Sequence, residues 1–262
     1  MIKKTGSYVD QGGYQAFIPA SLAKTVPSIK IEGELQELLE QATLFLARLD
    51  GIGYTLPNSD LFIAMYVRKE ALLSSQIEGT QASLQHVLAF ERGAKIDNPD
   101  DVEEVINYIN ALDYGIEKLA DFPMSLRLIK ELHGILLQGV RGKEQTPGQF
   151  RTVQNWIGPA GSSPKTATLV PPPPQEALRA MQELELYLHE HAAVPHLVNC
   201  ALIHYQFETI HPFLDGNGRL GRLLITFYLF WKGILQKPLL YLRKQYLHTE
   251  QIRTILLKTV IH

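Results

Sequence analysis

Apolar residues recur at three- and four-residue steps along most of the chain, which is the spacing of one buried face of an α-helix. In the first such segment Leu35, Leu38 and Leu46 follow this period, and Gly51 is placed to end the helix. The apolar run from Leu223 to Trp231 is long enough for a buried helix. The same period predicts further helices at about 61–77, 83–91, 100–112, 123–137, 178–188 and 195–208.

Two segments lack the helical period. Residues 1–30 hold scattered glycines and prolines and predict an irregular arm. Within the Gly-, Pro- and Ser-rich residues 139–174, two short β-prone runs at 153–158 and 166–170 predict a hairpin, which four prolines join to the next helix as a stiff polyproline segment. The whole pattern predicts an all-α fold with one short β-hairpin inserted.

The composition suits a globular protein and limits its partners. The chain has 262 residues, of which 45% are hydrophobic, enough for a core in one large or two modest domains. The formal net charge is −2, and no convincing basic patch stands out, so we expect no nucleic-acid partner.

The cysteine content and the apolar runs bear on the compartment. Cys200 is the single cysteine and lies among apolar residues, so we interpret it as a core residue in a reducing compartment. The first residues lack the apolar segment of a signal peptide, and the run 223–231 is far short of the ~20 residues that a membrane span needs. We therefore expect a cytoplasmic protein with no membrane contact.

The chemistry is concentrated at residues 211–222, His-Pro-Phe-Leu-Asp-Gly-Asn-Gly-Arg-Leu-Gly-Arg. Pro212 disfavours the α-conformation at His211, so the preceding helix should end there with the imidazole on a turn. Residues 216–218 can adopt positive φ and form an anion-binding nest at the start of the next helix. Arg219 and Arg222 share one face of that helix, which predicts a site for a di- or triphosphate.

Two further residues of this stretch suggest catalysis. Asp215 cannot bind phosphate itself, and a carboxylate beside phosphates needs a cation, for which Mg²⁺ is the natural candidate. His211, with an ordinary pKa of ~6.5, can take a proton from a hydroxyl group. The alternative is a turn whose arginines pair with local carboxylates; the pattern matches neither the phosphate loop of nucleotide hydrolases nor a dinucleotide fingerprint.

Residues 211–222 resemble the signature of the Fic family, His-Pro-Phe-x-Asp-Gly-Asn-Gly-Arg-x-x-Arg, at every fixed position. The resemblance implies a helical core and transfer of AMP from ATP to a Ser, Thr or Tyr hydroxyl of a target protein, with Mg²⁺. The roles that it implies are His211 as general base, Pro212 and Phe213 as structural residues, Asp215 as the Mg²⁺ ligand, Asn217 with the backbone of Gly216 and Gly218 on the phosphates, Arg219 on the α- and β-phosphates, and Arg222 on the γ-phosphate.

The resemblance extends to an inhibitory helix. Many relatives carry Ser/Thr-x-x-x-Glu-Gly/Asn, which residues 74–79 match with Ser74 and Glu78. Glu78 at the end of this N-terminal helix is then expected to pair with Arg222, often in a bidentate geometry, and to occupy the place of the γ-phosphate. The alternative is a solvated glutamate near a helix end.

The segment around 150–170 is similar to the flap of the family. Its residues Trp156, Ile157 and Gly158 are expected to bind the target backbone by strand addition, which would bring a target hydroxyl to His211. An ordinary surface loop is the alternative. The resemblance covers about residues 60–240 and weakens after Tyr241, where relatives place their adenine pocket.

The expected organisation is an N-terminal arm and helical inhibitory part at 1–95, followed by a catalytic core at 96–262. Three functions stay open: an autoinhibited AMP transferase that also modifies itself, an enzyme that removes AMP with Glu78 positioning water, and a non-catalytic module that senses nucleotide. A homodimer is compatible with each of them. The histidines outside the signature are interpreted as surface residues at 189, 191 and 196, without metal-ligand spacing, and as core residues at 133 and 204.

Overall fold

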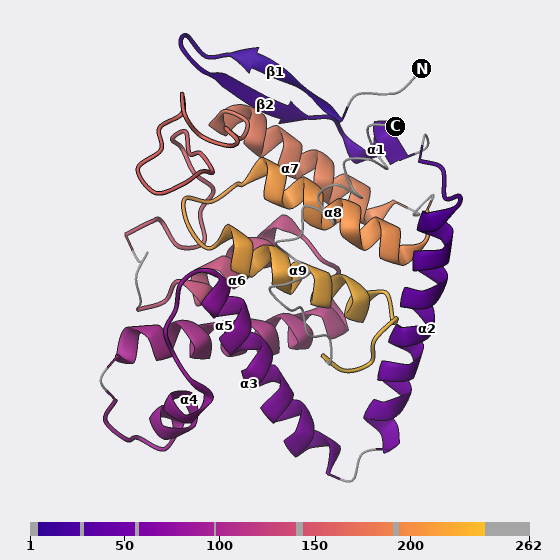
Figure 1. The fold of residues 1–262 in the computed structure, drawn as a ribbon, viewed down its shortest axis with the longest axis vertical. Helices are drawn as coiled ribbons and strands as arrows, with labels where there is room; N and C mark the ends of the chain where they lie inside the picture. The colour runs from indigo at the N-terminus through magenta and orange to yellow at the C-terminus, as the bar shows by residue number, and fades with distance from the viewer. Residues whose placement is uncertain are drawn as a thin grey trace.

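The computed structural model describes residues 5–26, 29–55, 58–96, 98–139, 144–190 and 194–238. Two predictions fall outside these residues: the adenine-pocket segment expected after Tyr241, and the surface position of His191. The described part is mostly helical (Figure 1). Its elements are β1 (Gly6–Asp10), β2 (Gln15–Pro19), α1 (Leu22–Thr25), α2 (Glu34–Thr55), α3 (Ser59–Ile77), α4 (Leu84–Glu91), α5 (Pro99–Asp121), α6 (Leu126–Leu136), α7 (Pro174–His189), α8 (His196–Ile210) and α9 (Asn217–Trp231).

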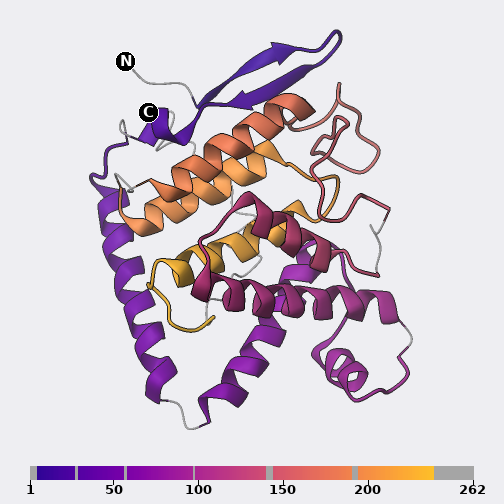
Figure 2. The ribbon, with the colours of Figure 1, turned by 180° about the vertical axis from the view of Figure 1, so that it is seen from behind.

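Helix α9 lies at the centre of the fold. It contacts α3, α5, α6 and α8, and in both ribbon views it runs between α8 and the α5–α6 pair (Figures 1 and 2). Most of its apolar residues are therefore buried, while Ile225, Phe230 and Trp231 are partly exposed. Gly115 of α5 permits a close approach, because an added Cβ would overlap the ring of Phe227. The loop that carries the signature is thus held at both ends by core helices.

The hydrophobic period located the other long helices, but several of their ends differ; α5, for example, continues to Asp121, beyond the predicted 100–112. Helix α2 continues past Gly51 to Thr55, so the predicted stop was wrong. Gly51 does not adopt a positive φ there, and an interior glycine costs a helix only about 1 kcal/mol relative to alanine. Helix α6 begins after Ser125, whose hydroxyl accepts the N–H of Leu128, and not at Pro123.

The predicted irregular arm was wrong, because residues 6–19 form an antiparallel hairpin. Its turn carries Gly12 and Gly13 at φ of 74° and 135°, and Ala16 of β2 is fully buried. Strand β2 lies over α7 and α8 (Figure 1), and the N–H of Phe17 donates to the carbonyl of Val170 at 2.8 Å. The two strands have only five residues each, and β1 is mostly exposed, so the sequence shows no clear alternation of apolar and polar residues. Packing against the rest of the protein defines them instead.

The predicted hairpin at 153–170 is reduced to a single antiparallel bridge. Ile157 and Leu169 exchange two backbone hydrogen bonds of 2.8 and 3.0 Å, and turns occupy the residues between them. Pro173 has φ −54° and ψ 155°, which is the polyproline conformation predicted for this segment, and Pro174 starts α7. None of the described helices combines the length and apolarity needed to cross a membrane.

Candidate active site

The site begins where α8 ends at His211. His211 adopts a left-handed conformation with φ 48° and ψ 61°, and Pro212 follows it, so the predicted helix end is confirmed. Arg151 fixes the new chain direction, because its Nε donates to the His211 carbonyl at 2.9 Å and its backbone N–H donates to the Pro212 carbonyl at 2.9 Å. Burial lowers the pKa of Arg151 to about 10.

Asn155 supports the same loop from the flap side. Its Nδ2 donates to the carbonyls of His211 and Phe213 at 3.2 and 2.9 Å. Sequence reasoning placed Arg151 in the flap and missed Asn155 altogether. Their importance comes from backbone carbonyls they contact about 60 residues away, which no local pattern in the sequence reveals.

Phe213 and Asn217 form the base of the loop. The Phe213 ring is fully buried and stacks on His133 with centroids 3.8 Å apart. The Asn217 amide is bonded to the Phe213 backbone at both ends, accepting from its N–H at 2.9 Å and donating to its carbonyl at 2.8 Å. Phe213 thus packs in the core, and the Asn217 side chain holds the loop through both of its hydrogen bonds, which leaves its backbone to face a phosphate.

His133 links this loop to Gly148, which lies just before the flap. Its Nδ1 accepts the N–H of Gly148 at 2.8 Å, so its Nε2 carries the proton and donates to the Asp215 carbonyl at 3.0 Å. The ring is fully buried, and this burial lowers its pKa to about 4. His133 is thus a neutral core histidine, as the sequence predicted, and it sets the position of Asp215.

The expected glycine nest is replaced by a helix N-terminus. Only Gly216 has a positive φ, at 73°, while Asn217 and Gly218 are already the first residues of α9. The prediction of positive φ at those two positions was wrong, because both residues already belong to the first turn of α9. The first N–H groups of α9 have no acceptor within the helix, and such a terminus binds anions.

Arg222 is bound by the end of α3, as the resemblance led us to expect. The buried guanidinium donates from Nη2 to Glu78 Oε1 at 2.7 Å. The pair is not bidentate, because Glu78 accepts from Nη2 alone. Ser74 binds the same guanidinium: its hydroxyl accepts from Nε at 2.7 Å and its carbonyl from Nη2 at 3.0 Å. Arg222 therefore contacts two residues at the end of α3, Ser74 and Glu78, which precede it in the sequence by 148 and 144 positions.

Gly218 makes room for the Glu78 carboxylate. A Cβ at Gly218 would overlap Glu78 Oε1 and would lie 3.2 Å from Arg222 Nη1. The carboxylate thus rests against the first turn of α9, where the helix terminus and Arg222 both attract an anion. Glu78 occupies this place while its side chain remains 40% exposed.

Arg219 and Asp215 lie on the other side of that terminus. Arg219 is buried, and its Nε and Nη1 have no hydrogen-bond acceptor within the described residues. Its nearest carboxylate oxygens are Glu104 Oε2 at 3.8 Å and Asp215 Oδ2 at 3.9 Å. Buried guanidinium donors without acceptors are costly unless a ligand completes them.

The donor set fits a magnesium ion shared with phosphates. The Asp215 side chain is 48% exposed, and the described residues contain no cluster of three or more metal-ligating side chains. Mg²⁺ is commonly held in this way, by one or two carboxylates together with substrate phosphates and water.

The imidazole of His211 can accept a proton at Nε2. Its Nδ1 lies 3.3 Å from the carbonyl of Glu208, and a proton shared there leaves Nε2 as the acceptor. Burial is the main influence and lowers the pKa of His211, while the carboxylates of Glu208 and Glu78 act in the opposite direction. A lowered pKa keeps the ring neutral at pH 7.

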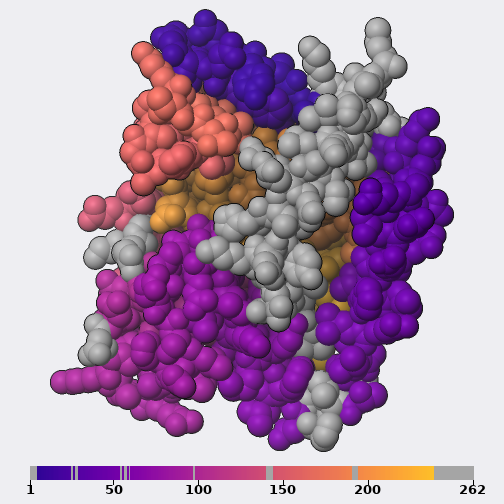
Figure 3. Space-filling view, in the orientation of Figure 1, coloured from indigo at the N-terminus to yellow at the C-terminus, as the bar shows by residue number. Residues whose placement is uncertain are grey.

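The three flap residues lie in the loop that crosses this site. Trp156 is 42% exposed and donates from Nε1 to the Ser162 carbonyl at 2.8 Å, Ile157 makes the bridge, and Gly158 packs against Ser162 and Ala167. In the space-filling view, orange atoms of the α8–α9 region show between the salmon flap and the purple end of α3 (Figure 3). The structure therefore brings the flap, the signature and the α3 end together.

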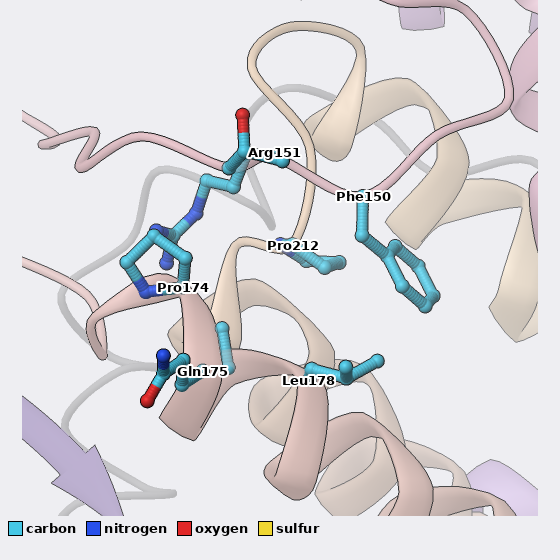
Figure 4. A pocket seen from close by; sticks show the side chains of 8 residues that line it. Phe150, Arg151, Pro174, Gln175, Leu178 and Pro212 are labelled. Atoms are coloured by element: carbon cyan, nitrogen blue, oxygen red, sulfur yellow. The ribbon is translucent and has the colours of Figure 1, made fainter.

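An apolar cavity of about 310 Å³ lies on the far side of Arg151 and Pro212. Phe150, Pro174 and Leu178 line it (Figure 4). The guanidinium of Arg151 is already bonded to backbone carbonyls, including that of Pro172 at 2.5 Å. Arg151 is the cation among the described residues that line this cavity, and its guanidinium is already engaged, so the cavity is poorly suited to a phosphate.

Comparison with known proteins agrees with this geometry. Residues 36–117 match the family described as Fic/DOC family N-terminal, and residues 123–229 match the Fic/DOC family. Protein adenylyltransferase Fic of Drosophila virilis is 35% identical over 159 residues, and that of Drosophila melanogaster is 33% identical over the same length. Each match covers 59% of this chain but only 29% of the relative, so the chain corresponds to less than a third of those proteins.

Solved structures share the fold. A Fic domain containing signaling protein from Bacteroides thetaiotaomicron has a TM-score of 0.65 at 22% identity, covering 83% of this chain and 80% of that one. Fic-1 from C. elegans has a TM-score of 0.64 at 22% identity, covering 92% and 71%. A Fic family protein from Desulfovibrio desulfuricans has a TM-score of 0.56 at 26% identity, covering 74% and 59%.

Proposed function

Because the chain belongs to the Fic/DOC family, we propose that it transfers AMP from ATP to a Ser, Thr or Tyr hydroxyl of a target protein and of itself. One observation carries the proposal: a histidine with an available Nε2 and a buried arginine with unpaired donors flank the N-terminus of α9. A base, a phosphate clamp and an anion-binding helix end are the parts that such a transfer needs.

The reaction uses these residues in defined roles. His211 Nε2 takes the proton of the target hydroxyl, whose oxygen forms a bond to the α-phosphorus of ATP while the bond to the β-phosphate breaks and pyrophosphate leaves. Arg219 and the first N–H groups of α9 bind the phosphate oxygens, and Arg222 binds the γ-phosphate. Asp215 would hold Mg²⁺, which neutralises phosphate charge when bound. The flap residues 156–158 position the target by strand addition.

We further propose that Glu78 inhibits the transfer. Its carboxylate accepts from the same guanidinium and lies against the same helix turn that the γ-phosphate needs. ATP that binds beside Glu78 has its γ-phosphate displaced, which moves the α-phosphate out of line with the attacking hydroxyl. The inhibitory part at 1–95 and the core at 96–262, a homodimer and a cytoplasmic location also belong to this proposal; the location rests on the single cysteine, which fits a reducing compartment.

Self-labelling tests the proposal. The protein is incubated with Mg²⁺ and ATP labelled on either the α- or the γ-phosphate. Glu78→Gly should raise labelling from the α-position at least tenfold, because Arg222 is released, and His211→Ala should abolish it. Label from the γ-position would contradict AMP transfer.

A matched control uses another glutamate at a helix end. Glu91 ends α4 and pairs with Arg68 at 2.9 Å, away from Arg222. Glu91→Gly should leave labelling at the level of the unaltered protein. An equal rise in both glycine variants would contradict inhibition by Glu78.

A further inference from the structure

A second carboxylate, that of Glu208, lies beside the proposed base. Its Oε2 is 3.9 Å from Nδ1 of His211, and the side chain is 30% exposed. Within the described residues the carboxylate makes no hydrogen bond, and it can form an ion pair with His211 only when the imidazole is protonated. Part of the side chain is buried, and removing a carboxylate from water without a hydrogen bond is costly to the fold.

A glycine of α9 provides the space for this carboxylate. A Cβ added at Gly221 would overlap Glu208 Oε1, just as one at Gly218 would overlap Glu78. Gly221 occupies one of the positions that the twelve-residue signature leaves unspecified, and Glu208 lies three residues before its start. The Glu208–Gly221 contact therefore involves no fixed position of the signature.

The charges around the pair define what Glu208 does to His211. Glu208 raises the pKa of His211, as does Glu78 from the end of α3, whereas burial and Arg151 from the flap lower it. Arg222 from α9 and His211 itself favour the ionised form of Glu208, against its burial and the charge of Glu78. Once Glu78 is removed, Glu208 is the acidic group left beside the imidazole.

We propose that Glu208 is a positioning residue, which acts through His211 by stabilising the imidazolium formed during transfer. The proposal rests on the proposed function. When Nε2 takes the hydroxyl proton, the ring becomes positively charged, with its Nδ1–H directed to the Glu208 carbonyl and its charge next to the Glu208 carboxylate. The proton then leaves from Nε2 to water, and the neutral base is restored.

NMR titration of the His211 ring in the Glu78→Gly protein tests the proposal, with its signal assigned by loss in His211→Ala. Adding Glu208→Gln keeps the shape and removes the charge. The pKa of His211 should fall by about one unit, because a charge at this distance contributes that much in a partly screened site. An unchanged or higher pKa would overturn the proposal.

The transfer rate supplies a second readout. In Glu78→Gly/Glu208→Gln the acid limb of the pH–rate profile should move to lower pH by the same amount, and the plateau should fall about three- to tenfold, because a weaker base catalyses less well. A role in packing alone would lower the melting temperature and leave the limb in place, which would overturn the proposal. Glu190→Gln, at an exposed glutamate after α7, is the control and should change neither quantity.

Two further outcomes are informative. Glu208→Asp keeps the charge at a greater distance, so the pKa of His211 should lie between those of the parent and the Gln variant. If the Gln variant did not fold, Glu208→Asp would serve in its place. A His211 pKa equal to the parent's would then overturn the proposal. The titration does not depend on turnover. Suppose that Glu208→Gln shifts the pKa of His211 but the Glu78→Gly parent transfers no AMP. The proposed function would then be refuted, and so would a catalytic role for the Glu208–His211 contact.

Discussion

At the scale of single residues, α9 combines two arginines with two glycines that admit carboxylates. Arg222 is bound by Ser74 and Glu78, and Gly218 leaves room for Glu78. The resemblance in sequence identified this pair, but it did not show that Ser74 takes Nε of the guanidinium. The positions of the glycines in the sequence do not show which side chains pack against them. The contact between Gly221 and Glu208 could therefore be found only in the structure.

Ser74→Ala should weaken the inhibition. The change removes the acceptor of Arg222 Nε and leaves a buried charged donor without a partner, at a cost of about 1–2 kcal/mol in unfolding free energy. Self-labelling should rise, though less than in Glu78→Gly, because Glu78 still binds Nη2. Chemical denaturation and the labelling assay measure the two effects.

Ser75→Ala is the matched control for Ser74→Ala. The neighbouring hydroxyl is equally buried but has no hydrogen-bond partner within the described residues. Labelling of this variant should equal that of the unaltered protein. If both alanine variants activated alike, the effect would come from α3 as a whole and not from the Ser74 contact.

At the scale of elements, the end of α3 is fastened to α5. The Thr80 hydroxyl donates to Glu104 Oε2 at 2.6 Å in a buried position, and the N–H of Gln81 donates to Asp101 Oδ2 at 2.9 Å. These bonds fix the turn just after Glu78. The period of apolar residues predicted α3 and α5 separately, but polar contacts between helices have no period, so this fastening could not be anticipated.

Thr80→Val should loosen the inhibitory turn. Valine has the shape of threonine but cannot donate to Glu104, so the turn should lose about 1–2 kcal/mol and Glu78 should leave Arg222 more often. We expect faster hydrogen exchange at residues 78–81 and a few-fold rise in self-labelling. Thr43→Val is the control, because the exposed Thr43 hydroxyl donates only within α2, to the Leu39 carbonyl at 2.7 Å; equal effects of the two changes would argue against the fastening.

At the scale of the whole molecule, the helical class and the signature loop could be predicted, while the long-range order could not. The helices follow from a strong period, and the end of α8 follows from the single dipeptide His211–Pro212. The β1–β2 hairpin was missed because its strands are short and are defined by packing on α7 and α8. The flap was predicted as a hairpin, but turn residues reduce it to one bridge. The division at residue 95 stays a prediction.

Acid should destabilise the whole fold through its buried histidines. Burial lowers the pKa values of His133 and His204 to about 4, whereas the unfolded chain titrates near 6.5. The unfolded state therefore binds more protons between these values, so the stabilisation is complete above pH 6.5 and is lost as the pH falls towards 4. For His133 the loss amounts to about 3 kcal/mol.

Urea unfolding across this pH range measures the effect. His133→Gln should flatten the dependence of unfolding free energy on pH, whereas His189→Gln, at an exposed position on α7, should leave it unchanged. A dependence that is equally steep in both variants would show that His133 is protonated in the folded protein, contrary to its bonds with Gly148 and Asp215.

The central claim is that the Glu78–Arg222 contact restrains AMP transfer by His211. Intact-mass spectrometry of three proteins after incubation with ATP and Mg²⁺ tests it most directly: the unaltered chain, Glu78→Gly, and Glu78→Gly/His211→Ala. We predict that Glu78→Gly gains the mass of one or more AMP groups, that the unaltered chain gains far less, and that the double variant gains none. Equal gains in all three proteins, no gain in any of them, or the mass of a single phosphate would contradict the claim.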